Sequence, residues 1–214
     1  MESKPFLAAV SGLGAAAARD AALKLAAAFP LRALISLGFG GGARPGLAPG
    51  DLVLGESIYL YDPETEELER VEANPCLPPL DTMLTLLKNG GLPAKIGALV
   101  TTPRILDKKG RLEALAALNT PVLDLETGAA ARVAAESGLS FLGLRAITDT
   151  GDEEIPEFVA RALNQGREPG PAQALRWLAQ NPRRLFTLLY LRKRSRLAAR
   201  RLAQALITVL PVLE

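Results

Sequence analysis

The fold of this chain is decided by the stretch Phe141-Leu142-Gly143-Leu144-Arg145-Ala146-Ile147-Thr148-Asp149. It is an apolar run of strand length that ends in a carboxylate. A shorter stretch, Pro121-Val122-Leu123-Asp124-Leu125-Glu126, repeats this arrangement. A buried strand that ends in an acid places the charge at the rim of a sheet, where α/β proteins bind ligands. The two stretches therefore predict a site at one edge of a sheet.

Around these stretches, apolar runs of strand length alternate with helical stretches rich in Ala and Leu. The alternation predicts an α/β domain with one parallel or mixed sheet covered by helices. We expect strands at Phe6–Val10, Ala33–Leu37, Leu52–Tyr59, Lys95–Val100, Val122–Leu123 and Phe141–Ile147. We expect helices at Ala15–Phe29, Leu80–Lys88, Lys109–Leu118 and Thr127–Ser137, and a polar hairpin within Tyr61–Pro79.

From Pro156 onward the pattern predicts only helix, broken at Gly166–Pro171 and at Asn181-Pro182. The expected domain organisation is thus an α/β core over residues 1–155, followed by a helical segment over residues 156–214. A length of 214 residues is sufficient for one ordinary domain with a substantial core.

The composition excludes several chemistries. The chain has no histidine, which rules out Ser-His-Asp triads, Cys-His pairs and His-based zinc sites. Its single cysteine, Cys76, cannot form an intramolecular disulfide and favours a reducing compartment. Acid–base chemistry then falls to Asp, Glu, Lys, Tyr or backbone groups. We expect no metal site and no cofactor.

The charge is distributed unevenly along the chain. Residues 183–214 carry eight basic groups and one acid, whereas residues 1–182 carry 17 basic and 22 acidic groups. The basic helix of residues 183–201 is either a packed, solvated helix or a surface that meets anionic lipid. The low aromatic content, 5%, and the absence of a nucleic-acid motif make nucleic acid an unexpected partner.

The chain shows no targeting or membrane-spanning signal. Its first residues do not read as a signal peptide, and no apolar run approaches the ~20 residues needed to span a bilayer. The expected location is the cytoplasm, with peripheral contact at the inner membrane surface as the lipid-binding alternative.

Two glycine motifs follow predicted strands. The first, Ser11-Gly12-Leu13-Gly14, opens a helix, so its free N–H groups could face an anion. NAD binding would also need an acid at the end of the next strand, but that strand ends Leu37-Gly38. The motif is therefore either a plain tight turn or an anion-binding turn, and the sequence does not decide between them. The second motif, Gly38-Phe39-Gly40-Gly41-Gly42, is either a flexible loop or, as we favour, a close backbone approach to a ligand.

Three carboxylates are the candidate functional groups. Asp124 either caps the helix that begins near Thr127 or binds a ligand. Glu126 lies in the first helical turn, which favours an acid without requiring one. Asp149 is either an acid of a loop or, as we favour, a general acid. A carboxylate that grips a sugar and a carboxyl that protonates a leaving base together predict cleavage of an N-glycosidic bond.

Several motifs, in their order and spacing, resemble the nucleoside phosphorylase and methylthioadenosine/adenosylhomocysteine nucleosidase superfamily. They are Ser11-Gly12-Leu13-Gly14, Gly38–Gly42 running into Pro49-Gly50-Asp51, Asp124-Leu125-Glu126, and Arg145–Asp149. The segment Ala174–Leu185 and its basic helix resemble the hopanoid-associated branch, which removes adenine from adenosylhopane. The resemblance implies a twisted mixed sheet flanked by helices, in a homodimer or larger homo-oligomer.

The resemblance also implies roles for individual residues. Glu126, flanked by Asp124 and Leu125, would hold the ribose hydroxyls, and Asp149 would protonate N7 of adenine. Thr101 and Ile105 would border the base. The pocket for water, or for phosphate as a co-substrate, would be lined by Gly12, Gly38, Phe39, Gly40 and Gly41.

Three features depart from the family pattern. The stretch that begins at Phe6 matches a later strand of the family. The extra first strand of the nucleosidases, which carries a water-activating Glu, therefore has no counterpart. The phosphate-binding segment of the phosphorylases has none either. Phe39 stands where the nucleosidases have a small hydroxyl residue, and Ile105 replaces an aromatic residue. The expected function is a nucleosidase or nucleoside phosphorylase that acts on an adenosine derivative with an apolar 5′ group. The alternatives are a nucleoside-binding protein without turnover and, disfavoured, a dinucleotide-dependent oxidoreductase.

Overall fold

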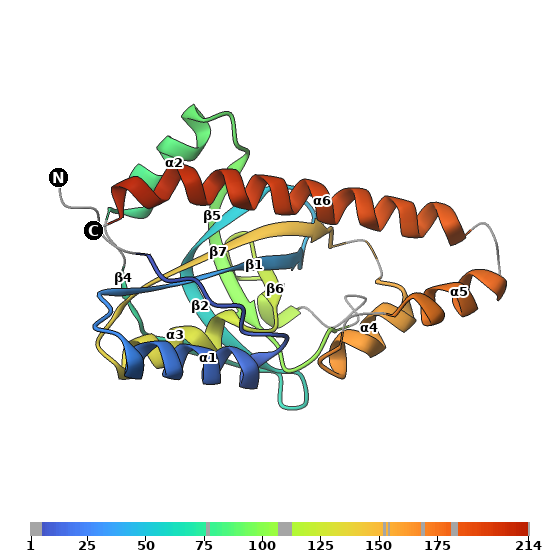
Figure 1. Cartoon of the computed structure of the whole chain (residues 1–214), viewed down its shortest axis with the longest axis horizontal. Helices are drawn as coiled ribbons and strands as arrows, with labels where there is room; N and C mark the ends of the chain where they lie inside the picture. Colours follow the sequence, from blue (N-terminus) through green and yellow to red (C-terminus); the bar gives the residue numbers. More distant parts are fainter. Residues whose placement is uncertain are drawn as a thin grey trace.

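In the computed structural model, a mixed β-sheet lies between two layers of helices (Figure 1). The structure describes residues 6–75, 78–106, 113–151, 153, 155–167, 170–180 and 184–213. The strands are β1 (Ala33–Gly42), β2 (Leu52–Asp62), β3 (Glu67–Val71), β4 (Asn74–Pro75), β5 (Ala94–Thr101), β6 (Val122–Asp124) and β7 (Ser140–Asp149). The helices are α1 (Ala15–Ala28), α2 (Leu80–Asn89), α3 (Thr127–Glu136), α4 (Glu157–Asn164), α5 (Pro171–Gln180) and α6 (Arg184–Val209), with 3-10 turns at Glu113–Leu115 and Leu210–Val212.

The sheet closes on itself. Its strand order is β3-β2-β5-β6-β1-β7-β4, and an additional antiparallel pairing joins β2 to β7. Strand β1 pairs in parallel with β7 along its whole length, from Ala33 to Gly41. On its other side β1 pairs with the short strand β6 only at Gly41 and Gly42. Most of that edge of β1 therefore has no strand beside it in the described part of the chain.

Two apolar layers hold the helices on the sheet. The helices α1 and α3 cover one face, where Leu34, Val53 and Phe141 point from the strands. The helices α2 and α6 cover the other face, where Leu142, Leu144 and Ala146 point. Residues of β7 alternate between the two layers because successive side chains of a strand point to opposite faces. Residues Ala198, Ala205 and Val209 place the second half of α6 in this core.

The α/β fold class, with a mixed central sheet flanked by helices and a C-terminal helix, is confirmed. The polar hairpin is also confirmed, as β2 and β3 pair around a turn that precedes Glu67. Residues 109–112 of the expected helix Lys109–Leu118 and the break at Asn181-Pro182 lie outside the described residues. The described part of that helix contains only the 3-10 turn Glu113–Leu115.

Two expectations about strands are wrong. The segment Phe6–Val10 forms no strand and is exposed, because it has no hydrogen-bonded neighbour among the described residues and contains Ala8-Ala9, a pair with low strand propensity. The glycine motif Gly38–Gly42 is not a turn but the second half of β1. Its ladder with β7 continues through Gly40, which pairs with Ile147.

Close packing against β6 explains why residue 40 is glycine. A Cβ atom at Gly40 would lie 2.5 Å from Cγ1 of Val122 and 3.1 Å from the backbone oxygen of Leu123. We predict that Gly40→Ala destabilises the protein by about 1–3 kcal/mol, the usual cost of overpacking, measured by urea unfolding. Gly170→Ala is the matched control, since a Cβ there meets nothing within 4 Å in the described structure. Adding Val122→Ala should recover part of the loss, and strict additivity of the two changes would contradict the steric explanation.

Candidate functional site

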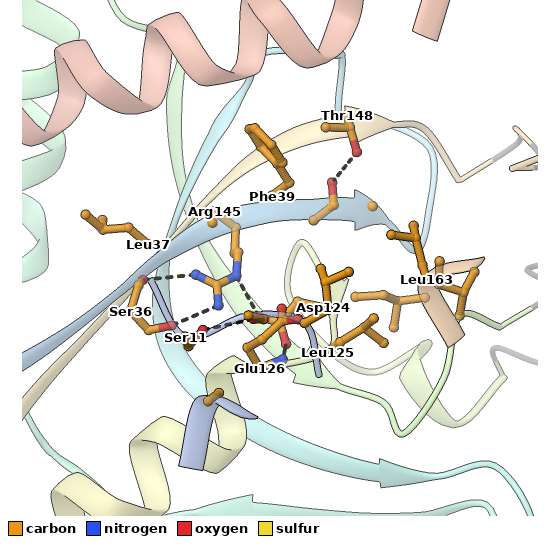
Figure 2. A pocket seen from close by; sticks show the side chains of 18 of the residues that line it. Ser11, Ser36, Leu37, Phe39, Asp124, Leu125, Glu126, Arg145, Thr148 and Leu163 are labelled. Atoms are coloured by element: carbon orange, nitrogen blue, oxygen red, sulfur yellow. Dashed lines mark hydrogen bonds and ion pairs between the residues drawn. The ribbon is translucent and has the colours of Figure 1, made fainter. Parts of the chain in front are cut away.

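A cavity of about 880 Å³ lies where β1 and β6 diverge (Figure 2). The segment before α1, strand β1 and the β6–α3 turn supply one part of its wall. Helix α1, the loop after β5, the end of β7 and helices α4, α5 and α6 also line the cavity. Its wall is mostly apolar, with a few polar groups that include Ser36, Asp124, Glu126, Arg145 and Asp149. An apolar cavity with few convergent polar groups is the usual form of a small-molecule site.

A buried ion pair crosses the base of this cavity. Nε of Arg145 lies 2.7 Å from Oδ2 of Asp124, and the side chains are 1% and 0% exposed. The two terminal nitrogens of Arg145 also donate to the backbone oxygen and the hydroxyl of Ser36, at 3.0 and 2.9 Å. A Cβ at Gly38 would lie only 3.4 Å from the guanidinium carbon, so the glycine leaves room for the arginine to pass β1.

Both carboxylate oxygens of Asp124 are hydrogen-bonded within the protein. Its Oδ1 accepts from the hydroxyl of Thr101 at 2.5 Å and from the backbone N–H of Glu126 and Thr127 at 3.2 Å each. Its Oδ2 accepts from the hydroxyl of Thr127. The N-cap of α3 is Glu126 and not Asp124, but the Asp124 carboxylate supports the start of the helix by accepting the N–H groups of Glu126 and Thr127. With both oxygens bonded and paired to Arg145, Asp124 orients the turn that carries Glu126.

Glu126 faces the cavity and meets the turn before α1. Its Oε1 accepts from the backbone N–H of Gly14 at 2.8 Å. Gly14 and Gly12 both have φ near +90°, in the region that favours glycine. One N–H of the predicted anion-binding turn thus binds a carboxylate of the chain itself. Burial raises the pKa of Glu126, the bond from Gly14 lowers it, and the charge of Asp124 raises it again.

Asp149 is the last residue of β7 and is buried at the cavity wall. Both Asp149 and its neighbour Thr148 line the cavity, at the point where the register of β7 with β1 shifts. Oδ1 of Asp149 lies 2.8 Å from the hydroxyl of Thr148. The cavity therefore has one carboxyl group from the β6–α3 turn and another from the end of β7.

Most of the other predicted site residues also line this cavity. These are Gly12, Gly38, Phe39, Gly40, Gly41, Ile105 and Leu125. Phe39, however, lies on the other side of β1 from Asp124 and Glu126 (Figure 2). Thr101 is not part of the described lining: it is buried behind Asp124, where its hydroxyl accepts from the N–H of Gly128 at 2.7 Å. Thr102 lines the cavity beside Ile105 instead.

Sequence reasoning missed the wall made by the three last helices. Phe158 and Leu163 of α4, Ala174 of α5, and Leu188 and Leu191 of α6 all line the cavity. Only the amphipathic pattern of these segments could have indicated a buried face, and that pattern does not reveal which part of the core it meets. No cluster of potential metal ligands occurs in the described parts of the chain, and none of the helices described is long and apolar enough to cross a membrane.

Comparison with known proteins defines the class to which this fold and site belong. A family model of the phosphorylase superfamily matches residues 2–168. This chain belongs to the phosphorylase superfamily.

Individual relatives agree with this assignment. A 5′-methylthioadenosine/S-adenosylhomocysteine nucleosidase from Marinomonas sp. (strain MWYL1) is 26% identical over 179 residues, which cover 78% of each chain. Among solved structures, the nucleosidase of the same name from Campylobacter jejuni is 20% identical, with a TM-score of 0.58 over 72% of this chain and 71% of its own. A putative methylthioadenosine nucleosidase from Weissella paramesenteroides is 22% identical, with a TM-score of 0.55 over 77% and 75%. The two structures establish the similarity of fold.

The buried pair gives a prediction about stability. Arg145→Met should destabilise the protein by about 3–5 kcal/mol in urea unfolding, because it leaves the Asp124 carboxylate buried without its partner. Arg132→Met is the control: its ion pair with Glu69 is largely exposed, so the loss should stay below about 1 kcal/mol. Combining Arg145→Met with Asp124→Asn removes the orphaned charge and should cost less than the two single changes summed. Equal losses for Arg145→Met and Arg132→Met would refute the role of the buried pair.

The raised pKa of Glu126 gives a prediction about pH. The folded protein holds the Glu126 proton more tightly than the unfolded chain does. This group therefore favours folding at pH values below 4.5, the ordinary pKa of a glutamate. That advantage is lost as the pH rises through the raised pKa of the folded state. The difference in Tm between Glu126→Gln and the wild type should therefore be more positive at pH 7 than at pH 4. The exposed Glu67→Gln is the control, and identical pH dependence of the two variants would contradict the prediction.

Proposed function

We propose that this chain cleaves the N-glycosidic bond of a purine nucleoside and releases adenine from an adenosine derivative with an apolar 5′ group. The observation that carries the proposal is the pair of carboxyl groups, Glu126 and Asp149, on the wall of one largely apolar cavity. Membership of the phosphorylase superfamily, and nucleosidases among the relatives, support the same reaction.

The proposed roles follow from where charge develops. When the C1′–N9 bond breaks, its electron pair leaves with the base and positive charge builds on the sugar. Glu126 accepts hydrogen bonds from the ribose hydroxyls and stabilises that positive charge. Asp149 delivers a proton to N7, so that the base leaves neutral. Water or phosphate then bonds to C1′. In the hydrolytic case the water gives up a proton, which in the net balance replaces the proton that Asp149 gave to the base.

The supporting residues share the remaining tasks. In this proposal Leu125 and Ile105 pack against the substrate, while Gly12 and Gly38–Gly41 border the space for water or phosphate. Asp124 and Thr101 act indirectly, by fixing the turn of Glu126. No cofactor takes part, and phosphate enters only as a co-substrate if the reaction is phosphorolysis.

The apolar wall supports the identity of the 5′ group. Leu163 closes the cavity at the side of α4 (Figure 2), and Leu188 and Leu191 of α6 line it from above the sheet. A cavity of about 880 Å³ lies near the upper end of the range of about 300–1,000 Å³ that is usual for ligand pockets. We therefore propose a long apolar substituent, of the kind carried by adenosylhopane.

Two further parts of the proposal concern the setting of the reaction. The chain acts as a homodimer or larger homo-oligomer, as the resemblance implies. The basic helix of residues 183–201 lies against the inner surface of a membrane, where a lipid-linked nucleoside is found.

The experiment is to measure adenine release from 5′-alkylthio-5′-deoxyadenosines with short and long alkyl groups, with and without phosphate. We expect release, faster with the long group, and a loss of about 10²–10⁴ in rate for Asp149→Asn. Glu126→Gln should raise KM, because it weakens the grip on the ribose. Asp81→Asn, an exposed change on α2, should leave the rate unchanged.

Each outcome decides between alternatives. Release in plain buffer identifies a nucleosidase, and release only with phosphate identifies a phosphorylase. Tight binding without release identifies a nucleoside-binding protein and refutes the proposed reaction. Full activity of Asp149→Asn would show that another group protonates the base.

A further inference from the structure

Helix α5 and the first two-thirds of α6 form an arm that extends past the end of the sheet (Figure 1). We define the arm as residues 171–180 and 184–200. Among the described residues of α6, Ala198 is the first that belongs to the apolar core on this face of the sheet. The part of the arm farthest from the core exposes large apolar side chains, with Phe186 75% exposed. The others are Leu175, Leu185, Leu189 and Tyr190.

A basic stripe follows these apolar residues along α6. Arg192, Lys193, Arg196 and Arg200 are all exposed, and their spacing of one, four and eight residues keeps them on one side of the helix. In the described part of the chain none of the four has an ion-pair partner, and α6 contains no acidic residue. Their charges are therefore not neutralised within the arm.

Arg194 differs from its neighbours and shows which side of α6 faces inward. It is buried, forms an ion pair with Glu153 and stacks over the ring of Tyr190 at 3.7 Å. The bond from Arg194 lowers the pKa of Glu153, against the effect of partial burial. With Arg194 facing inward, Lys193, Arg196 and Arg200 point away from the protein, while Arg192 lies at the border of the cavity.

The apolar end and the basic stripe meet in a shallow groove of about 470 Å³. Leu189 and Tyr190 line it on the apolar side, and Lys193, Arg196 and Arg200 on the basic side. Exposed apolar side chains next to unneutralised arginines and lysines are typical of helices that bind anionic membrane surfaces. A second copy fits poorly, because a two-fold contact through this face would bring the two basic stripes together.

The same helix also belongs to the candidate site. Leu188, Leu191 and Ser195 line the large cavity, while Arg192 lines both the cavity and the groove. A surface that covers the exposed face of the arm therefore reaches the apolar wall of the cavity within one helical turn.

We propose that this arm docks on an anionic lipid bilayer, with Phe186 and Leu189 entering the boundary between head groups and acyl chains. Arg192, Lys193, Arg196 and Arg200 bind the phosphates of the head groups. Docking places the cavity beside the bilayer, from which an apolar substrate can enter without crossing water. The docking develops the membrane contact of the proposed function, and only the entry of the substrate rests on the proposed reaction.

The first experiment is co-sedimentation of the full chain with vesicles, without substrate. We expect binding to vesicles of 30% phosphatidylglycerol in phosphatidylcholine, little binding to pure phosphatidylcholine, and weaker binding as salt rises. Lys193→Ser/Arg196→Ser/Arg200→Ser should weaken the binding roughly a hundredfold, since each basic residue near an anionic surface contributes about a factor of five. Arg192 is left intact because it lines the cavity.

Two matched controls separate a docking surface from general charge. Arg19→Ser/Arg32→Ser/Lys88→Ser removes three exposed basic residues from elsewhere, so it changes the net charge equally and should retain most of the binding. Phe186→Ser should weaken binding several-fold, whereas Ile207→Ser, at a position 72% exposed on the same helix, should not. Equal losses in the two triple variants, or no binding to anionic vesicles at low salt, would overturn the proposal.

A second copy of the chain is tested in the same series by analytical ultracentrifugation. If Phe186→Ser dissociates an oligomer and the wild type ignores vesicles, the arm is a protein interface and the lipid proposal is wrong. Adenine release from a short-chain nucleoside then tests the catalytic proposal independently. Loss of vesicle binding in the stripe variant with that release unchanged shows that docking and catalysis are separate properties.

Discussion

The buried ion pair between Arg145 and Asp124 is the interaction on which the site depends. Arg145 extends from the middle of β7, passes Gly38 of β1 and reaches the β6–α3 turn. It thereby joins the element that ends in Asp149 to the turn that carries Glu126. A charge without a partner is costly in an apolar interior. The two elements are thus held in one relative position, and the two carboxyl groups of the cavity with them.

The same arrangement divides the three acids by role. Asp124 has its oxygens bonded to Arg145, to two threonine hydroxyls and to backbone N–H groups, so it is a structural anion. Glu126 has a partner in Gly14 at the cavity wall, and burial raises its pKa. The difference comes from burial: the Asp124 side chain is buried, whereas that of Glu126 is partly exposed at the cavity wall. Two acids separated by one residue can therefore have unlike functions.

The elements of the fold could largely be predicted from the sequence, because the spacing of apolar residues and the composition of a segment are properties of that segment alone. The strands after residue 33 and helices α1, α2 and α3 begin or end within a few residues of the expected positions. The segment Phe6–Val10 could not be predicted, since strand formation depends on a neighbour that the local sequence does not specify. The loop that the glycines Gly38–Gly42 suggested is instead the second half of β1. Gly38 and Gly40 make room for Arg145 and Val122, which are distant in sequence.

The partial pairing of β1 explains both the cavity and its apolar wall. Because β6 reaches β1 only at Gly41 and Gly42, the remaining edge of β1 is free to border a space instead of a strand. Residues before α1 lie on one side of that space, and α4 to α6 lie on the other. Sequence alone could place Glu126 and Asp149 at strand ends, but not the helices opposite them. The contribution of α6 to both core and cavity requires its Arg194–Glu153 contact, which joins residues far apart in the chain. Helix α6 thus has one face in the core, one at the cavity and a third that is basic and exposed.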